Sequence, residues 1–372
     1  MSKPIRILNM FTIMNRGGAE TMVMNYYRNI DRSKVQFDFL VHRQERGAYD
    51  DEIEALGGRI YRMIPIYPQN FMQYKKDIRN FFKEHKEYKI IHSHMSELGY
   101  FAFKEAKNQG IPIRICHAHN TPHDFDLKMI MRNYFKYAMR PYITHMFTCS
   151  KDSGIWLYGK KNIDKLIQMN NAIDAKKFKF NKDFDKKVKK NLGIENKLVI
   201  GHVGRFNKQK NHEKVIDIFN EIIKLNSNAC LILVGEGNLK GEIKNKVSKL
   251  GLSNNVLFLG SRDDVNEIMQ AFDVFLFPSL YEGLGIVLIE AQAAGIPCLT
   301  SDKVVPIEAK VTSLLNYYPL ENNSNLWAKK TLDILTEKYD TYNEIKKAGF
   351  DIQNNAKWLE EFYINEYNKY NK

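Results

Sequence analysis

The stretch Phe272-Asp-Val-Phe-Leu-Phe-Pro-Ser-Leu-Tyr-Glu-Gly-Leu-Gly-Ile-Val-Leu-Ile-Glu-Ala-Gln292 decides how this chain folds. Its first six residues are an apolar run that is typical of a buried parallel strand, and Pro278 and Ser279 end that strand. The two glycines of residues 282–285 predict a loop, because glycine permits positive φ and close backbone approach. The apolar residues 286–294 then predict a buried helix, so the stretch indicates a strand–loop–helix unit of an α/β protein.

Two carboxylates stand in this unit, Glu282 on the loop and Glu290 within the helix. The free N–H groups of the helix's first turn point toward the same space, and such helix ends attract anions and ligand oxygens. A carboxylate in a largely apolar helix needs a partner, because burial of an unpaired charge is costly. We therefore expect ligand hydroxyl groups to contact both carboxylates.

The two acids and the sequence around them resemble a known family. Glu282 and Glu290 are separated by seven residues, and the run FPSLYEGLGIVLIEAQAAGIP resembles the E-x7-E segment of retaining glycosyltransferases, family 4 in particular. The resemblance implies the GT-B fold, an α/β architecture of two Rossmann-like doubly wound parallel-sheet domains facing a cleft. It also implies that catalysis requires no metal or other cofactor. The alternative for this stretch is a helix with a structural role alone.

The chain's length and composition fit this architecture. At 372 residues the chain is long for one core and suits two domains. No apolar run reaches the ~18 residues of a membrane-spanning helix, and the first four residues lead directly into a predicted strand, so no signal peptide is expected. The cysteines are scattered in or beside predicted strands, which indicates a reducing compartment, the cytoplasm: Cys116, Cys149, Cys230 and Cys298.

The net charge of +13 is unevenly distributed along the chain. Residues 1–180 hold 30 Lys and Arg against 18 Asp and Glu, whereas residues 181–372 hold 26 against 25. A basic half favours an anionic partner, which is a membrane surface, nucleic acid or a phosphorylated substrate. The alternative, a lysine-rich solvated surface, fits the second half better than the first.

Apolar runs alternate with helical stretches along the whole chain, as expected for an α/β protein. Strands are predicted at residues 5–11, 36–41, 59–63, 89–93, 112–117, 145–149, 198–203, 229–234, 256–259, 273–277 and 297–300. Helices of the first half are predicted near 19–30, 49–56, 71–86, 97–109, 127–141 and 151–157. We predict one domain at 1–172 and a second at 173–354. The resemblance makes the first the acceptor-binding domain and the second the nucleotide-sugar-donor-binding domain, and implies that a C-terminal helix, about 355–372, packs back on the first.

The loop after the first strand of the second domain carries two candidate catalytic cations. The segment Gly201-His-Val-Gly-Arg-Phe-Asn-Lys-Gln-Lys-Asn211 turns at Gly204 and presents Arg205 and Lys210 above the strand ends. A guanidinium and an ammonium group together suit a diphosphate leaving group, whose charge grows as the glycosidic bond breaks. The arrangement matches the family's phosphate-binding pair, and the family spacing favours Lys210 over Lys208. The alternative is a solvated basic loop.

Further loops are expected to hold the donor. Asn15-Arg-Gly-Gly-Ala-Glu20 places two glycines at a strand-to-helix turn, where backbone N–H groups approach a phosphate or sugar, and it is not the G-x-G-x-x-G of a nicotinamide site. In the family, the loops that match these segments face the diphosphate or hold the base. The first acid of the E-x7-E segment and its neighbours bind hydroxyls of the donor sugar, and the second acid binds the ribose hydroxyls. The resemblance thus implies donor-binding roles for Gly17, Gly18, Gly204, Gly235, Arg262, Val265, Gly283, Leu284, Gly285 and Glu290. Ordinary turn chemistry is the alternative, most of all for Arg262 and Val265.

Histidines gather after two strands of the first domain. The segment Arg114-Ile-Cys-His-Ala-His-Asn-Thr121 ends one strand, and the family places a histidine here beside the reacting sugar, for which His119 is the best match. This histidine is expected to orient donor hydroxyls or to help manage a proton, and the alternative is a structural histidine. A cluster of histidines also makes a metal site worth considering: His92, His94, His117, His119 and His123. These histidines come from two separate strand ends and include no H-E-x-x-H helix, so we expect no metal.

Residues 127–142 predict an amphipathic helix that is rich in Met and aromatic residues. Lys128, Arg132, Lys136 and Arg140 stand at four-residue spacing, which predicts one basic stripe beside an apolar face. Such a helix can lie on an anionic leaflet, so we expect peripheral contact with the inner face of the plasma membrane. A helix that buries its apolar face in the domain has the same sequence pattern.

The expected function is that of a retaining glycosyltransferase with a nucleoside diphosphate sugar, a UDP-sugar, as donor. The expected acceptor is a saccharide or lipid-linked saccharide in capsule, exopolysaccharide or other cell-surface polysaccharide synthesis. The predicted catalytic residues are Arg205, Lys210, Glu282 and His119. Two alternatives stay open, a nucleotide-sugar epimerase of the same fold without redox cofactor and a basic nucleic-acid-binding protein. The latter predicts aromatics interleaved with Lys and Arg on one surface, whereas basic residues here spread over many elements, so no nucleic-acid partner is expected.

Overall fold

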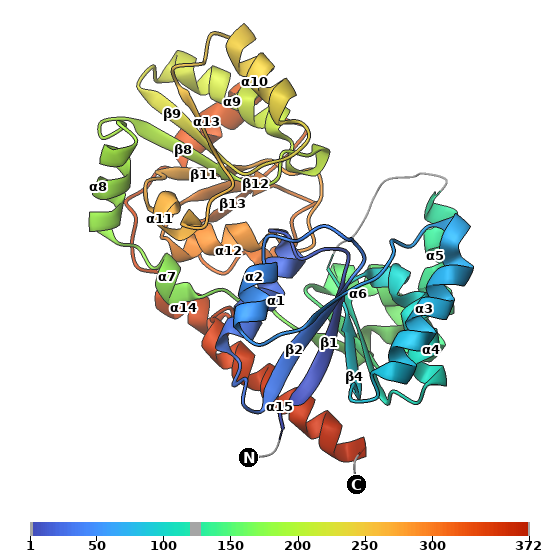
Figure 1. Ribbon diagram of the computed structural model, residues 1–372. Coiled ribbons are helices and arrows are strands. Elements are labelled where there is room, and N and C mark those ends of the chain that lie inside the picture. The colour runs from blue at the N-terminus through green and yellow to red at the C-terminus, as the bar shows by residue number, and fades with distance from the viewer. Residues whose placement is uncertain (1–2, 120–127, 371–372) are drawn as a thin grey trace. The chain divides into compact units, whose positions relative to one another are not determined.

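The computed structural model describes residues 3–119 and 128–370, with residues 128 and 129 described by their backbone alone. Two compact units make up the chain: unit 1 is Met1–Ala172 with Ile352–Lys372, and unit 2 is Ile173–Asp351. Each unit is built on a parallel sheet with helices packed against it (Figure 1). His123 and Leu127, for which the sequence makes predictions, lie outside the described residues.

The sheet of unit 1 has the strand order β3-β2-β1-β4-β5-β6-β7, and its neighbouring strands are parallel. Its strands are β1 (Ile5–Phe11), β2 (Val35–Val41), β3 (Ile60–Arg62), β4 (Ile90–Ser93), β5 (Ile113–Ala118), β6 (His145–Thr148) and β7 (Leu166–Gln168). The chain moves outward from β1 in one direction and then restarts at β4 on the other side of β1. Doubly wound sheets bind ligands at the carboxyl ends of their strands, beside such a reversal.

Helices cover both faces of the unit 1 sheet, because successive strand residues point to opposite faces. Ile7 packs in one cluster with α1 and α15, whereas Leu8 packs in another with α3, α4 and α6 (Figure 1). The helices are α1 (Gly18–Asn29), α2 (Asp50–Ala55), α3 (Phe71–Glu84), α4 (Tyr100–Asn108), α5 (Lys128–Ala138), α6 (Lys151–Tyr158) and α15 (Ile352–Tyr370). Short 3-10 helices are η1 (Pro68–Asn70), η2 (Ser96–Gly99), η3 (Arg140–Tyr142) and η4 (Lys160–Lys165). The C-terminal helix α15 places Leu359 and Tyr363 in the first cluster.

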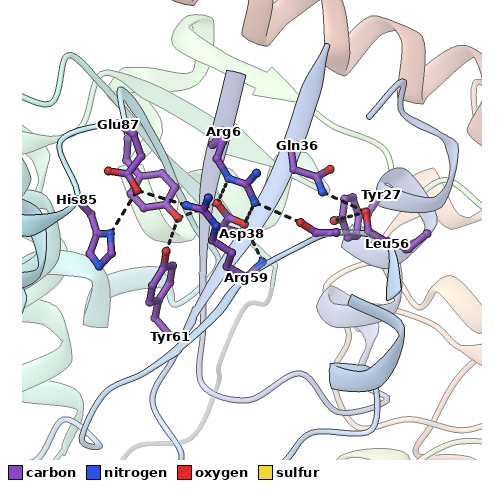
Figure 2. A network of polar contacts seen from close by, with 11 residues as sticks. Arg6, Tyr27, Gln36, Asp38, Leu56, Arg59, Tyr61, His85 and Glu87 are labelled. Carbon is purple, nitrogen blue, oxygen red and sulfur yellow. Dashed lines mark hydrogen bonds and ion pairs between the residues drawn. The ribbon is translucent and has the colours of Figure 1, made fainter. Parts of the chain in front are cut away.

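A buried carboxylate fixes β1 against β2. Asp38 of β2 is fully buried, and both of its oxygens accept hydrogen bonds from the Arg6 guanidinium of β1 (Figure 2). The Arg59 N–H and the Tyr88 hydroxyl donate to the same carboxylate at 2.8 and 2.7 Å. A buried charge that loses its partner costs about 3–5 kcal/mol, so these contacts hold the two strands in one register.

The sheet of unit 2 has the order β10-β9-β8-β11-β12-β13 and is also parallel. Its strands are β8 (Leu198–Val203), β9 (Ala229–Val234), β10 (Val256–Gly260), β11 (Val274–Phe277), β12 (Cys298–Ser301) and β13 (Leu315–Tyr318). Its helices are α7 (Ala175–Phe178), α8 (Lys182–Asn191), α9 (His212–Leu225), α10 (Lys240–Lys249), α11 (Val265–Gln270), α12 (Ile286–Ala293), α13 (Ser324–Asp333) and α14 (Tyr342–Lys347), with η5 (Lys208–Lys210) and η6 (Ile307–Ala309). The strand order reverses between β8 and β11, as it does between β1 and β4 in unit 1.

Every predicted strand occurs within one residue of its predicted ends, and the fold class of two parallel-sheet α/β domains is confirmed. Two strands, β7 and β13, were not predicted from the sequence, and both are short edge strands with polar residues among their apolar ones. The helix predicted at 97–109 begins as the 3-10 helix η2 and continues as α4. Among the helices of residues 3–119 and 128–370, none combines the length and the apolarity that crossing a bilayer requires.

Candidate active site

The predicted donor site of unit 2 lies where the strand order reverses. β8 and β11 are neighbours, with Phe275 opposite Gly201. Lys210 ends the short helix η5 after β8, and Glu282 lies in the loop after β11. The sheet topology therefore brings together two side chains that stand 72 positions apart in the sequence.

Lys210 and Glu282 form an ion pair that is largely buried. The Lys210 Nζ lies 2.6 Å from Glu282 Oε1, and the two side chains are 16% and 5% exposed. The same ammonium group lies over the Phe277 ring, 4.5 Å from the ring centroid. A cation and an anion thus stand side by side, which suits a ligand that carries both phosphate oxygens and hydroxyl groups.

Polar contacts between the two loops support this ion pair. The Gln209 carbonyl oxygen accepts a backbone hydrogen bond from the other loop at 2.9 Å, and the Gln209 amide donates to the Tyr281 carbonyl oxygen at 2.9 Å. The Asn211 amide donates to the Pro278 carbonyl oxygen at 3.0 Å. Asn211 has a φ of 53°, in the left-handed region that asparagine adopts more readily than most residues. These contacts position the cation opposite the carboxylate.

Gln209, Asn211 and Phe277 support the pair but were not predicted from the sequence. A signal was present for a fourth supporting residue, because an asparagine three residues before Lys210 is typical of a helix N-cap. Asn207 takes this role, and its side-chain oxygen accepts a hydrogen bond from the Lys210 N–H at 3.2 Å. The contacts of Gln209 depend on which loop lies opposite, and a sequence pattern does not supply that information.

Arg205 is exposed on the loop that leads to η5, and its side chain has no hydrogen-bond or ion-pair partner among the described residues. Two glycines shape this loop. The Gly204 N–H donates to the Val234 carbonyl oxygen at 2.9 Å, and a Cβ on Gly235 would collide with the Gly204 carbonyl oxygen. Gly235 also has a φ of 141°, which L side chains rarely adopt. Glycine at 235 therefore lets two loops approach each other behind the Arg205 cation.

Glu290 lies on α12, whose N-cap Gly285 has a φ of 78° and begins the helix directly after the loop. Gly283 and Leu284 are buried in that loop. Burial raises the pKa of Glu290 to about 7. The half-buried Glu290 side chain has no hydrogen-bond or ion-pair partner among the described residues. Its carboxylate oxygens are thus available to a ligand.

Arg262 and Val265 lie after β10, the edge strand of the unit 2 sheet. The Arg262 Nε and Nη2 donate to the two carboxylate oxygens of Asp264 at 2.8 and 2.7 Å, and this pair is exposed. Val265 is the first residue of α11. Neither residue contacts the Lys210–Glu282 pair, so their roles in donor binding stay predictions.

Gly17 and Gly18 form the predicted strand-to-helix turn of unit 1. Gly17 is the N-cap of α1 and Gly18 is its first residue. A Cβ on Gly17 would collide with the Glu20 carboxylate, whereas Gly18 has open space around it. Because β1 borders β4 at the reversal of strand order, this turn lies at the edge where such sheets bind ligands. A ligand at this turn stays a prediction.

His119 lies directly after β5 and contacts His94, which lies directly after β4. His119 Nε2 is 2.9 Å from His94 Nδ1, and His94 Nε2 is 3.4 Å from Asn9 Oδ1. Because the amide oxygen accepts, the His94 Nε2–H donates, His94 Nδ1 accepts, and the His119 Nε2–H donates. The buried His119 Nδ1 then keeps a lone pair and has no partner among the described residues. Burial lowers the pKa of His119 to about 3, so this neutral ring suits acceptance of a hydrogen bond from a hydroxyl group.

The histidines of β4 and β5 are close together, although they come from two separate strand ends. β4 pairs with β5, and ring nitrogens of His92, His94 and His117 lie within 4.8 Å of one another. However, the rings stack, with angles of 24° between the planes of His92 and His94 and 15° between those of His92 and His117. Imidazole binds a metal through lone pairs in the ring plane, and stacked rings do not direct three such pairs at one point. The absence of a metal from the mechanism stays a prediction.

Two of the basic residues that were predicted to form one stripe, Arg132 and Lys136, contact other elements of unit 1. Arg132 pairs with the buried carboxylate of Glu97 at 2.5 Å. The Lys136 ammonium lies over the Trp156 ring, 4.8 Å from its centroid. These side chains contact the body of unit 1, because the helix face that carries them packs toward η2 and α6.

The chain has two doubly wound parallel sheets and a cation–carboxylate pair where the strand order of the second sheet reverses. Together these features define a class of protein: the GT-B glycosyltransferases. Comparison with known families agrees. Residues 16–176 match the family described as Glycosyltransferase Family 4, and residues 183–351 match Glycosyl transferases group 1. The chain belongs to this glycosyltransferase family, whose members retain the configuration of the transferred sugar.

Individual relatives cover between 72% and 97% of the chain. It is 36% identical over 361 residues to the Putative glycosyltransferase EpsF of Bacillus subtilis (strain 168), with 94% of both chains covered. It is 28% identical over 288 residues to the Escherichia coli UDP-Gal:alpha-D-GlcNAc-diphosphoundecaprenol alpha-1,3-galactosyltransferase, with 72% of both covered. Identity is 23% over 373 residues to the Capsular polysaccharide biosynthesis glycosyltransferase CapH of Staphylococcus aureus, with 97% of this chain and 99% of that protein covered.

A solved structure shares the fold. Anabaena Alr3699/HepE in complex with UDP-glucose superposes with a TM-score of 0.75 at 19% identity, over 97% of this chain and 99% of that chain. Family membership favours sugar transfer over the epimerase and the nucleic-acid-binding alternatives. The roles of individual site residues are not decided by these likenesses and stay predictions.

Proposed function

We propose that the protein transfers a sugar from a UDP-sugar to a saccharide or lipid-linked saccharide during synthesis of a cell-surface polysaccharide such as a capsule or exopolysaccharide. The observation that carries the proposal is the Lys210–Glu282 ion pair at the reversal of strand order in unit 2. A nucleotide sugar carries a diphosphate and a hydroxylated ring, which are the groups that an ammonium and a carboxylate bind.

In the proposed complex, Lys210 exchanges its contact with Glu282 for a phosphate oxygen. Arg205 adds a guanidinium group, and its exposure and lack of a described partner support this role. Negative charge grows on the diphosphate as the bond from the sugar C1 breaks, so fixed cations stabilise the transition state more than the bound donor. Glu282 and the backbone of 283–285 then accept or donate hydrogen bonds to the sugar hydroxyls.

Glu290 is proposed to accept hydrogen bonds from the ribose hydroxyls. Its lack of a described partner supports this role. Burial raises its pKa to about 7, and hydrogen bonds from hydroxyl groups would lower this pKa because they favour the ionised carboxylate. Donor binding near neutral pH should therefore release a proton. His119 is proposed to hold a sugar hydroxyl through its unpaired Nδ1.

The proposed transfer needs no nucleophile from the protein. The acceptor hydroxyl oxygen bonds to the sugar C1 on the face from which the diphosphate leaves, so the configuration is retained. The electron pair of the broken C1–O bond goes to the diphosphate, and the acceptor proton passes to a phosphate oxygen of that leaving group. The protein's own residues bind, orient and stabilise charge in this scheme.

Relatives support the choice of donor base and acceptor class. The HepE structure contains UDP-glucose, and the E. coli relative is named for a UDP-Gal donor and a diphosphoundecaprenol-linked acceptor. CapH is named for capsular polysaccharide biosynthesis. The four cysteines are free and buried, which fits the proposed cytoplasmic location.

Turnover of labelled UDP-sugars tests the proposal. We expect Glu282→Ala and Arg205→Ala to lower transfer by at least about 100-fold, because the first removes a group that positions the donor sugar and the second removes a cation that stabilises the transition state. Lys208→Ala is the matched control, since Lys208 is exposed on η5 two residues before Lys210, and it should change transfer by less than about twofold. Undiminished transfer by either of the first two variants would contradict the assignment.

A further inference from the structure

Three side chains form a hydrogen-bonded chain across the central strands of the unit 1 sheet. Asn9 lies within β1, and His94 and His119 lie directly after β4 and β5. The sheet order places β4 between β1 and β5, so His94 stands between the other two. His119 Nε2 is 2.9 Å from His94 Nδ1, and His94 Nε2 is 3.4 Å from Asn9 Oδ1. The chain therefore joins a residue inside the sheet to His119, at the edge where the strand order reverses.

Packing holds both rings of this chain in one orientation. Asn9, His94 and His119 are 1%, 8% and 9% exposed. The Phe11 ring stacks on His94, with centroids 4.4 Å apart and an angle of 9° between the planes. The His117 ring stacks on His119 in the same way, at 4.1 Å and 25°. Because rings that are buried and stacked do not turn over freely, the same nitrogens stay in contact.

The positions of the two ring protons follow from the amide at the end of the chain. Burial holds the pKa of His94 well below 6.5 and lowers that of His119 to about 3, so both rings are neutral and each has one donor and one acceptor nitrogen. The Asn9 oxygen can only accept, which puts the His94 proton on Nε2 and, in turn, the His119 proton on Nε2. His119 Nδ1 remains an acceptor, without a partner among residues 3–119 and 128–370.

The Asn9 amide does not serve the packing of the core. Its neighbours in β1, Leu8 and Met10, are fully buried apolar residues. Its Nδ2 is buried and has no partner in the part of the chain that the structure describes. A buried N–H group without a partner destabilises a core, so an apolar side chain would suit a purely structural role better. The contact with His94 is the role that the geometry supports.

We propose that Asn9 and His94 are positioning residues that keep the His119 proton on Nε2, so that His119 Nδ1 selects a substrate hydroxyl group able to donate a hydrogen bond. The proposal rests on the proposed function, in which His119 contacts a hydroxyl group of the sugar. A fixed acceptor discriminates against a group that cannot donate, because the buried lone pair would then be left unpaired.

NMR of the full chain labelled with ¹⁵N-histidine tests the proton positions without any substrate. The shift of an imidazole nitrogen separates an N–H from a lone pair, and the signals of the ten histidines can be assigned from single variants. The parent should carry the protons of His94 and His119 on Nε2. His94→Leu should leave His119 as a mixture of tautomers, whereas His94→Asn should restore the parental signal, because an amide oxygen can replace the accepting Nδ1. His92→Leu is the matched control, since it makes the same change two residues earlier on β4, and it should leave His119 unchanged.

Transfer kinetics test what the fixed acceptor does. With a UDP-sugar that the parent turns over, kcat/KM should fall at least about tenfold in His94→Leu and in Asn9→Leu, and His94→Asn should return to within about threefold of the parent. Asn9→Leu leaves both rings in place and supplies the same test if His94→Leu does not fold. In monofluorinated analogues of that sugar one hydroxyl at a time loses its ability to donate. One analogue should lose at least about tenfold in the parent but less than about threefold in His94→Leu.

Three results would overturn the proposal. The first is a parent with the His119 proton on Nδ1, and the second is parental kinetics in both His94→Leu and Asn9→Leu. The third is an equal loss in His92→Leu and His94→Leu, which would make the effect one of packing. Parental circular dichroism and UDP affinity show that a variant is folded. Absence of transfer by a parent with the expected tautomers would contradict the proposed function rather than the proton positions.

Discussion

Replacement of Lys210 by methionine tests the ion pair on which the proposed function rests. Lys210→Met keeps an unbranched apolar side chain beside Phe277 but leaves the Glu282 carboxylate, which is 5% exposed, without its cation. Removal of one partner from a buried pair costs about 3–5 kcal/mol, and the 16% exposure of the Lys210 side chain favours the lower end. We expect the free energy of unfolding of unit 2 to fall by about 3 kcal/mol.

Tryptophan fluorescence can report on unit 2 alone. The chain has three tryptophans, of which Trp327 is fully buried in unit 2, whereas Trp156 and Trp358 belong to unit 1. In a Trp156→Phe/Trp358→Phe background, urea unfolding at pH 7 followed through Trp327 compares Lys210→Met with its parent. A reporter in one unit is needed because a chain of two units does not have to unfold in a single step.

A double-mutant cycle separates the ion pair from other effects of the substitution. Lys210→Met/Glu282→Gln removes both charges, so this double variant should be more stable than Lys210→Met alone by about 2 kcal/mol. Coincident urea curves for the parent and Lys210→Met, together with additive effects in the cycle, would refute the reasoning. UDP binding measured on the same samples should weaken in both Lys210 variants, because the phosphate loses its ammonium partner.

Three further outcomes follow from the geometry of the two units. Gly235→Ala adds a Cβ that collides with a backbone carbonyl at a φ of 141°, so UDP affinity measured by calorimetry should fall at least about tenfold, whereas Gly241→Ala, which meets open space in α10, should leave it unchanged. Because burial raises the pKa of Glu290 to about 7, the native state keeps a proton that the unfolded state releases between pH of about 4.5 and 7. The free energy of unfolding of unit 2 should therefore fall by about 2 kcal/mol as the pH rises across that range. Urea titrations of Glu290→Gln should lack this fall. His94 and His117 act in the opposite direction, because burial holds the pKa of each well below 6.5. The free energy of unfolding of unit 1 should therefore decrease as the pH falls below about 6.5. His117→Gln should make this decrease less steep, measured in a variant whose only tryptophans are in unit 1. A pH-independent stability of either parent unit would contradict the corresponding assignment.

The sequence predicted the fold well where burial on two faces constrains the residues. β11 is a continuous apolar run that ends at Pro278, and both its ends are predictable from composition and turn chemistry. β7 and β13 are edge strands with one side unpaired, so their residues need not be uniformly apolar and no pattern identifies them. The start of α4 was similarly ambiguous, because a 3-10 turn and the first turn of an α-helix use the same residues.

For the candidate site, the sequence predicted which side chains carry chemistry but not how they contact one another. Glu282 and Lys210 were each expected to face a ligand, and the structure additionally places them in contact with each other. That contact depends on β8 lying beside β11, a result of strand order that periodicity does not encode. The same reasoning applies to the histidines, whose stacking follows from the pairing of β4 with β5. Long-range strand pairing is therefore the information that the sequence patterns lacked.

The cross-bonded loops of unit 2 have a consequence for engineering. Gln209 and Asn211 donate their side-chain amides to carbonyl oxygens of the segment after β11, so each loop completes the hydrogen bonding of the other. A chimaera that imports one loop from a relative leaves two amides facing a foreign backbone, at a cost of about 1–3 kcal/mol for each unsatisfied group. Residues 204–211 and 278–285 should therefore be transplanted as one cassette when a different transferred sugar is sought.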